Sequence, residues 1–259
     1  MIANYHTHTW RCMHAFGDER EYVEQAIRGG LKILGFSDHT PVPYKDGYVS
    51  NVKMTPDQLE DYVDTVLSLR DEYRKDIEIH LGLEVEYYPG YIDAMLEMMK
   101  PYPIEYFLLG QHFLGDEIGE PYCGERTYSS DSLLRYCRQT KEAMKTGLFT
   151  YFAHPDVIFY IGDKNIYARN MRDLCETAKE LSVPLEINLL GIETNRNYPN
   201  PLFWKIAGEV GNDVVIGSDA HFPENVVNED ALRAADRIIK ENGLHLLKTV
   251  DIINPLEKR

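Results

Sequence analysis

The sequence predicts an α/β fold, a barrel of parallel strands that carries its chemistry at the carboxyl ends of those strands. Seven short apolar runs alternate along the chain with longer amphipathic stretches of helical periodicity. This alternation is typical of repeated strand–helix units that build a parallel sheet. Histidine-rich motifs follow most of the apolar runs, and ligands of such sheets bind beyond the carboxyl ends of the strands.

Each strand–helix unit is recognised by its hydrophobic pattern, and some of the helices also have a residue that is typical of a helix start. The strands are expected at residues 1–5, 32–36, 77–83, 106–110, 149–153, 183–188 and 213–217, and helices among others at 18–28, 56–74, 131–146, 170–181 and 229–241. Thr55 before Pro56, and Ser130 before its apolar residues, are helix start signals. Seven units approach the eight of a closed barrel, and a doubly wound open sheet is the alternative.

The length and composition are those of one enzyme-sized domain. The 259 residues suit a single unit over 1–259, with 44% hydrophobic and 27% charged residues. No apolar run is long enough to span a bilayer, and no secretory signal opens the chain. The four cysteines form no paired motif, so we expect a reducing, cytoplasmic location.

The net charge limits the partners. A formal charge of −15 argues against nucleic acid, because binding its backbone requires clustered Lys and Arg. It does not exclude a small anionic substrate, because a few bound divalent cations would dominate the local potential.

Seven of the nine histidines fall at or just after the end of an expected strand, together with two carboxylates. This set of nine candidate metal ligands is His6, His8, His14, His39, Glu84, His112, His154, Asp219 and His221. His80 and His245 lie outside the pattern. A lone histidine is usually an ordinary core or surface residue, but seven on one face of a sheet are unlikely to be independent accidents.

The spacing and the residue types indicate which metals are expected. Residues i and i+2 of a strand face the same side, so His6 and His8 can reach one ion, and Asp219 and His221 share that spacing. Imidazole and carboxylate ligands suit Zn, Mn or Fe. Nine ligands exceed the need of one ion, and a glutamate can bridge two, so the sequence predicts a multinuclear site.

The loop after the sixth strand bears on the substrate. Asn188 ends that strand, and Glu193 and Arg196 follow it. The Arg196 guanidinium can clamp a phosphate, although a solvated loop arginine is an equal alternative. Asn188 is expected to orient the substrate or to hold the loop. Asp38 is expected to orient a neighbouring histidine, with direct metal binding or proton donation as the alternatives.

On these residues the chain resembles the polymerase-and-histidinol-phosphatase (PHP) superfamily. The motifs that carry the resemblance are Tyr5-His-Thr-His8, Phe36-Ser-Asp-His39, Gly110-Gln-His112 with Ala153-His-Pro155, and Gly217-Ser-Asp-Ala-His221. Within the superfamily the chain is most similar to monofunctional histidinol-phosphate phosphatases, on Ser37-Asp-His-Thr-Pro41, His154-Pro-Asp156 and Leu185-Glu-Ile-Asn188. Gln111 and Leu189-Leu190 depart from that pattern, so the identity of the substrate stays open.

The resemblance implies a distorted (β/α)7 barrel with three divalent ions. One ion would be held by His6, His8, Glu84 and Asp219, a second by His14, His39 and His221, and a third by Glu84, His112 and His154.

It also implies hydrolysis of L-histidinol phosphate to L-histidinol and phosphate by a metal-bridging hydroxide. Arg196 would neutralise the phosphoryl oxygens, and Glu186 or Glu193 would bind the cationic end of the substrate. Metal-bound water, His14, Asp38 and His221 are the alternative proton donors. The rival functions are hydrolysis of another small phosphomonoester or a nucleotide, and a non-catalytic metal-binding module.

Overall fold

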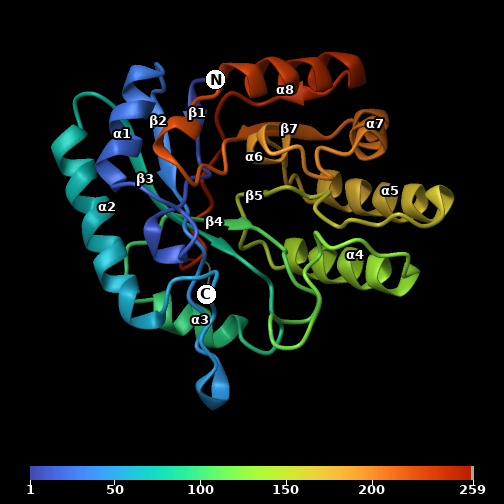
Figure 1. Ribbon diagram of the computed structural model, residues 1–259, viewed down its shortest axis with the longest axis horizontal. Coiled ribbons are helices and arrows are strands. Elements are labelled where there is room, and N and C mark those ends of the chain that lie inside the picture. The colour runs from blue at the N-terminus through green and yellow to red at the C-terminus, as the bar shows by residue number, and fades with distance from the viewer. Residues whose placement is uncertain (258–259) are drawn as a thin grey trace.

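The computed structural model describes residues 1–257, and residues 258–259, the end of the predicted domain, lie outside the described range. The strands are β1 Ala3–Asn4, β2 Ile33–Phe36, β3 Glu78–Val85, β4 Tyr106–Leu109, β5 Tyr151–Phe152, β6 Leu185–Asn188, β7 Asp213–Gly217 and β8 His245–Leu246. The α-helices are α1 Glu19–Arg28, α2 Leu59–Tyr73, α3 Ile92–Met99, α4 Ser130–Lys145, α5 Lys164–Glu180, α6 Leu189–Glu193, α7 Pro201–Val210 and α8 Glu229–Asn242. Figure 1 shows most of these helices around the outside of the strands.

The strands form one parallel sheet whose spatial order is the order of the chain, β1 to β8. Beyond the carboxyl ends of β1 and β7, the backbone segments that follow these two strands are hydrogen-bonded to each other. The His8 amide donates to the Ala220 carbonyl at 3.0 Å, and the Ala220 amide donates to the His6 carbonyl at 3.3 Å. This link brings motifs from the two ends of the chain together at one mouth.

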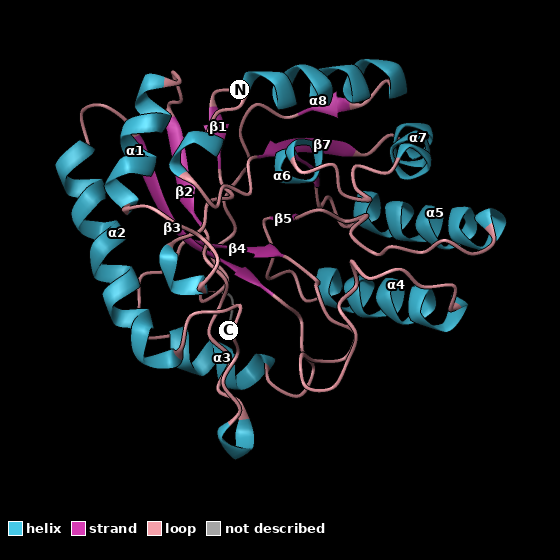
Figure 2. Ribbon diagram, in the orientation of Figure 1, coloured by secondary structure: helices cyan, strands magenta, loops and turns pink. Residues whose placement is uncertain are grey.

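The predicted barrel of parallel strands is confirmed, and the doubly wound alternative is wrong because the strand order never reverses. All seven expected strands are present. The eighth strand, β8, escaped prediction because it is two residues long and its His245 is exposed. Figure 2 shows the strands enclosed by helices over most of their circumference.

Local signals account for several helix ends. The carboxylate of Asp18 caps α1 while Glu21 returns to the Asp18 amide, a reciprocal pair that satisfies free amides of the first turn. Asn228 caps α8. The predicted start at Thr55–Pro56 is present as a short 3₁₀ helix that leads into α2. The helix expected at 170–181 begins earlier, at Lys164, where Asp163 caps it.

The interior of the barrel is filled by side chains from alternate strand positions. Ala3, Tyr5, Tyr106, Leu108, Tyr151, Ala153 and Val215 form this buried cluster. The Tyr106 hydroxyl donates to the carbonyl oxygens of Tyr5 at 2.7 Å and Phe36 at 3.1 Å, so the ring spans the inside of the barrel. This packed layer is the floor beneath the polar groups at the carboxyl ends of the strands.

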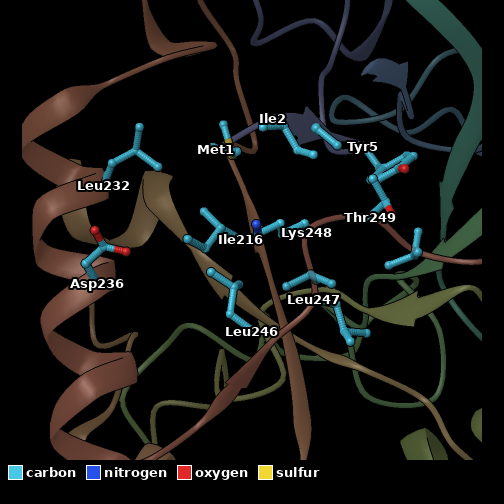
Figure 3. A pocket seen from close by; sticks show the side chains of 13 residues that line it. Met1, Ile2, Tyr5, Ile216, Leu232, Asp236, Leu246, Leu247, Lys248 and Thr249 are labelled. Atoms are coloured by element: carbon cyan, nitrogen blue, oxygen red, sulfur yellow. The ribbon is translucent and has the colours of Figure 1, made fainter. Parts of the chain in front are cut away.

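At the opposite end of the barrel β1 and β8 leave a gap. The C-terminal segment packs Leu247, Val250 and Ile252 against the interior cluster there. A cavity of about 270 Å³ remains between β1, β8 and α8. Figure 3 shows Met1 and Ile2 facing this cavity together with Leu232 of α8 and Leu246 of β8.

Candidate metal centre

The nine predicted ligands gather at the mouth of the barrel. The imidazole ring of His8 lies at its centre, with ring centroids 4.2 Å from His221, 4.3 Å from His39 and 5.2 Å from His6. Several overlapping sets of three have their ligand atoms within 4.8 Å of one another. Residues that are up to about two hundred positions apart in the chain therefore share one site.

Glu84, near the end of β3, is the hub of this site. Its Oε1 lies 2.8 Å from His154 Nε2 and 3.8 Å from His112 Nε2. Its Oε2 lies 2.9 Å from His39 Nδ1 and 3.6 Å from His6 Nε2. The two oxygens thus face different groups of histidines, which is the arrangement that a bridging carboxylate needs.

Asp219 completes a second set with the two histidines of the first strand. Its Oδ1 lies 3.0 Å from His8 Nε2 and 3.5 Å from His6 Nε2. His6, His8 and Asp219 form one of the groups that fit a single ion.

His14, His39 and His221 form a further group of this kind. His14 Nδ1 hydrogen-bonds to the Cys12 carbonyl at 2.7 Å, and His221 Nδ1 to the Asp219 carbonyl at 2.9 Å. Because these bonds occupy Nδ1, each ring presents its Nε2 to the site.

Several buried ligand atoms of the site lack a hydrogen-bond partner, as expected of atoms that bind a cation. His6 Nε2, His8 Nε2, His221 Nε2 and Glu84 Oε2 are buried without a hydrogen-bond partner among the described residues. Buried polar atoms without partners are costly and rare. Their convergence at the mouth of the barrel, with a nitrogen and oxygen donor set that suits Zn, Mn or Fe, is the fit expected of a metal centre.

The protonation states of four of these ligands also suit metal binding. Burial raises the pKa values of Glu84 and Asp219, but surrounding histidines outweigh it and hold both well below the usual range. Burial lowers the pKa values of His39 and His221 well below 6.5. Ionised carboxylates and neutral imidazoles are the forms that bind cations. Burial also lowers the pKa of His8, but Asp219 and Asp38 raise it to about 9, so metal binding there would release a proton.

Two glycines make room for the carboxylates. A Cβ atom at Gly110 would lie 1.9 Å from Glu84 Oε1, and one at Gly217 would lie 1.7 Å from Glu186 Oε1. Any larger residue would displace Glu84 or Glu186 from the centre of the barrel.

Glu186 and Asp38 lie behind the histidines of the first strand. Glu186 Oε1 is 2.8 Å from His6 Nδ1, and Asp38 Oδ1 is 3.4 Å from His8 Nδ1. Asp38 also accepts a hydrogen bond from the Thr9 hydroxyl. Both carboxylates are fully buried and absent from the pocket lining. They have the position of acceptors that orient a ligand, as was expected first of Asp38, while a substrate contact was predicted for Glu186.

Asn188 and Asp156 are likewise turned toward the protein. Asn188 donates to Glu186 and to Asp219 Oδ2, each at 3.0 Å, so it holds two carboxylates in place. Asp156 accepts from the Asn200 amide at 2.5 Å, where burial raises its pKa to about 7.

The site opens into a pocket of about 520 Å³. Its polar lining includes His14, His112, Asp219, His221 and Arg196. Its apolar and aromatic lining comprises Val52, Phe113, Tyr122, Leu190, Tyr198 and Phe222.

Arg196 lies on this wall, as a phosphate clamp requires. Its Nη1 donates to the Tyr198 hydroxyl at 2.9 Å and its Nε to the Thr194 hydroxyl at 3.1 Å. Glu193, predicted beside it as a substrate ligand, accepts from Asn225 and is not part of the pocket lining.

Sequence reasoning missed Lys53 and Glu86, which also line the pocket, and Glu117, which pairs with Lys53. Glu86 lies two residues after Glu84, so the alternation of the strand places it on the same face. Lys53 and Glu117 belong to loops without a recognisable pattern, and no signal marks them.

Comparisons with known proteins agree with this geometry. The family model of the PHP domain matches residues 4–197. A probable histidinol-phosphatase of Deinococcus radiodurans is 28% identical over 87% of this chain and 88% of its own length. A probable phosphatase of Caldanaerobacter subterraneus is 27% identical over 97% of this chain and 89% of its own length.

Solved structures show the same fold. A putative histidinol phosphatase of Listeria monocytogenes superposes with a TM-score of 0.73 at 20% identity, covering 89% of this chain and 99% of its own. The histidinol phosphate phosphatase of Lactococcus lactis, complexed with Zn, L-histidinol and phosphate, gives a TM-score of 0.75 at 18% identity, covering 97% and 98%. No helix among residues 1–257 is long and apolar enough to cross a membrane.

Proposed function

The chain belongs to the PHP domain family, and from this premise we propose that it hydrolyses L-histidinol phosphate with water to L-histidinol and inorganic phosphate. Family and relatives make it a metal-dependent phosphatase. The choice of substrate is supported by the probable histidinol-phosphatase of D. radiodurans and by the fold shared with the L. lactis enzyme, which holds L-histidinol and phosphate. The single observation that carries the proposal is the convergence of nine metal-ligand candidates at the mouth of the barrel, five of which line a pocket walled by Arg196.

The first two of the proposed ligand sets each contain a group of three residues whose ligand atoms lie within 4.8 Å of one another. His6, His8, Glu84 and Asp219 would hold one ion, His14, His39 and His221 a second, and Glu84, His112 and His154 a third. Zn, Mn or Fe fits this donor set. When bound, such cations supply positive charge for the phosphoryl oxygens and lower the pKa of water, the source of the hydroxide that attacks phosphorus.

The chain's own side chains would position the substrate. Arg196, fixed by Tyr198, would bind phosphoryl oxygens with its free donors. The flat imidazole of the substrate would pack against Phe113 and Tyr122 on the pocket wall. Of the candidate proton donors, His14 and His221 line the pocket, but each would bind an ion through Nε2 while its Nδ1 bonds to a backbone carbonyl. We therefore place donation to the leaving alkoxide with a water molecule in the pocket. We further propose that residues 1–259 act as one unit in the cytoplasm.

The test is a metal analysis coupled to a substrate panel. Purified protein loaded with Zn, Mn or Fe should release phosphate from histidinol phosphate at a higher kcat/KM than from sugar phosphates or nucleotides. A preference for another phosphomonoester would assign the same site a different substrate.

The role of the metal is tested separately. His8→Ala and Asp219→Ala should each lower activity by more than about 100-fold, beyond the range of outer-sphere substitutions, and should reduce the metal content together with it. Full activity of a metal-free preparation would exclude the proposed chemistry.

A further inference from the structure

We propose that Lys53 is a positioning residue of the metal centre, which acts through Glu86 to fix His112 as a ligand. This inference rests on the proposed function, because it concerns the third set of ligands, Glu84, His112 and His154. Lys53 comes from the loop between β2 and α2, far along the chain from each of them.

Within the set of Glu84, His112 and His154, His112 is the ligand that most needs support. Its Nε2 is 3.8 Å from Glu84 Oε1, whereas His154 Nε2 is 2.8 Å from the same oxygen. Its side chain is 16% exposed, against 1% for His154. It follows β4 on a loop rather than standing on the strand, so the sheet does not hold it directly.

Glu86 supplies that support. Its Oε2 accepts hydrogen bonds from the backbone amides of His112 at 3.1 Å and Phe113 at 3.0 Å. Its Oε1 lies 3.6 Å from His112 Nδ1. One carboxylate therefore holds the backbone of His112 and faces its inner ring nitrogen, with Nε2 turned toward Glu84. Carboxylates in this place behind a metal-binding histidine fix the orientation of the ring.

Glu86 needs a counter-charge to stay in this position. It is 2% exposed, and an unpaired carboxylate at such a site is costly. Lys53 Nζ lies 2.8 Å from Glu86 Oε1 and 2.9 Å from Glu117 Oε2. The Lys53 ammonium, itself 3% exposed, also lies 5.2 Å from the centre of the Phe113 ring. The position of the Lys53 ammonium is therefore fixed by its contacts with Glu86, Glu117 and Phe113.

Glu117 anchors the loop that carries Lys53. It accepts hydrogen bonds from the hydroxyl groups of Tyr44 at 2.8 Å, Tyr48 at 3.1 Å and Ser50 at 2.7 Å. All three belong to the same loop as Lys53, so this cluster closes residues 44–53 over the segment that follows His112. The contacts with Glu117 secure the loop, and the contact of Lys53 with Glu86 reaches the metal centre.

The experiment is equilibrium dialysis of the metal-free protein against buffered Zn²⁺, with bound zinc counted per chain. In Lys53→Met we expect one zinc ion to bind about 10 to 100 times more weakly than in the wild type, the usual effect of removing support behind a ligand. The remaining zinc should bind as in the wild type. Lys45→Met, an exposed lysine of the same loop, is the matched control and should reproduce the wild-type isotherm.

The outcomes separate positioning from a purely structural role. If all zinc ions weaken equally, or if none does, Lys53 does not position His112 and the inference is wrong. If Lys53→Met yields no folded protein, Glu86→Gln tests the same link from the other side. Selective loss of one ion in that variant supports the inference, and an unchanged isotherm overturns it.

Failure of the proposed function would look different. Wild-type protein that binds no zinc and releases no phosphate from any substrate would remove the metal centre itself. Wild-type protein that is active, alongside a Lys53→Met variant with wild-type zinc binding, would reject only the positioning role.

Discussion

Glu186 touches four residues of the site without facing the pocket. It contacts His6 Nδ1 at 2.8 Å and accepts from the His154 amide at 3.0 Å, Asn188 at 3.0 Å and the Tyr151 hydroxyl at 3.3 Å. A single carboxylate thus fixes two metal-ligand candidates. This arrangement favours an orienting role over the substrate contact predicted from sequence.

The two roles differ in what a substitution changes. Glu186→Gln keeps the shape but removes the charge that holds His6, so zinc affinity or kcat should fall about 10- to 100-fold at an unchanged KM. Steady-state kinetics with a zinc isotherm make the distinction, with Glu193→Gln, off the pocket wall, as the control. A raised KM with intact zinc binding would instead favour the substrate contact.

Arg196 is the residue whose role depends most on the substrate. If it binds phosphate, Arg196→Ala removes a charge-assisted hydrogen bond of about 1.5–3 kcal/mol, equivalent to roughly 10- to 100-fold in kcat/KM. The zinc isotherm should not change, because Arg196 is no ligand candidate. Arg126→Ala is the control, since its guanidinium lies over Phe159 instead. Equal kinetics for Arg196→Ala and wild type would make it a solvated loop residue.

Among the secondary-structure elements, Glu105, which directly precedes β4, connects this strand to β3 and α2. It accepts from the Leu81 amide of β3 at 2.7 Å and from Arg70 of α2 at 3.2 Å. Burial raises the pKa of Glu105, but His80, the Leu81 amide and Arg70 outweigh it and hold the pKa below its usual 4.5. A lowered carboxylate pKa stabilises the fold above the unfolded value, and this stability is lost as the pH falls through the folded value.

The resulting pH dependence can be measured. Glu105→Gln should lower the free energy of unfolding near pH 7 by about 1 kcal/mol, the typical value of one hydrogen bond. The difference from wild type should shrink below pH 4.5 as the wild-type carboxyl is protonated. Urea unfolding of the metal-free proteins across pH provides the measurement. A difference that grows on acidification would contradict the assigned direction.

Between elements, Arg11 makes a contact that no local sequence pattern indicates. It is 2% exposed and pairs with Glu19 of α1 and Asp61 of α2. Asp61 lies 50 residues away in the chain, so no local pattern indicates that the two helices enclose Arg11. Its Nη1 also donates to the Thr9 hydroxyl at 3.3 Å, which links this pair of helices to Asp38 behind His8.

For the whole molecule, metal binding and stability are linked. Four buried ligand atoms lack hydrogen-bond partners among the described residues, and the chain has a net charge of −15. A bound cation should therefore stabilise the fold. At a free concentration 100 times the Kd, each zinc should add about 2.7 kcal/mol, a rise in Tm of several degrees for a chain of this size. Thermal unfolding followed by circular dichroism measures the rise.

Calcium serves as the control, because it prefers an all-oxygen shell and should leave Tm nearly unchanged. The zinc-induced rise should shrink in His8→Ala. An equal rise with calcium, or none with zinc, would contradict a nitrogen-rich metal centre.

Much of the fold and of the ligand set was predictable because both depend on local periodicity. Apolar runs mark the strands, and the alternation of side chains places His6 with His8, and Asp219 with His221, on common faces. Parallel strands bring their carboxyl ends to one edge whatever the loops between them do. For this reason the nine ligand candidates could be proposed as one cluster before any coordinates were known.

The features that the sequence did not predict depend on contacts between distant segments, which leave no periodic pattern in the sequence. The closure of β1 on β7 through Ala220, the burial of Arg11, and the cluster of Lys53, Glu86 and Glu117 each join residues from separate loops or helices. The orientation of the Glu186 side chain, toward His6 rather than the pocket, likewise depends on contacts between distant segments. The path of a loop and the rotamer of a buried side chain depend on everything packed around them, so only the folded chain determines which carboxylates orient ligands and which side chains reach the substrate.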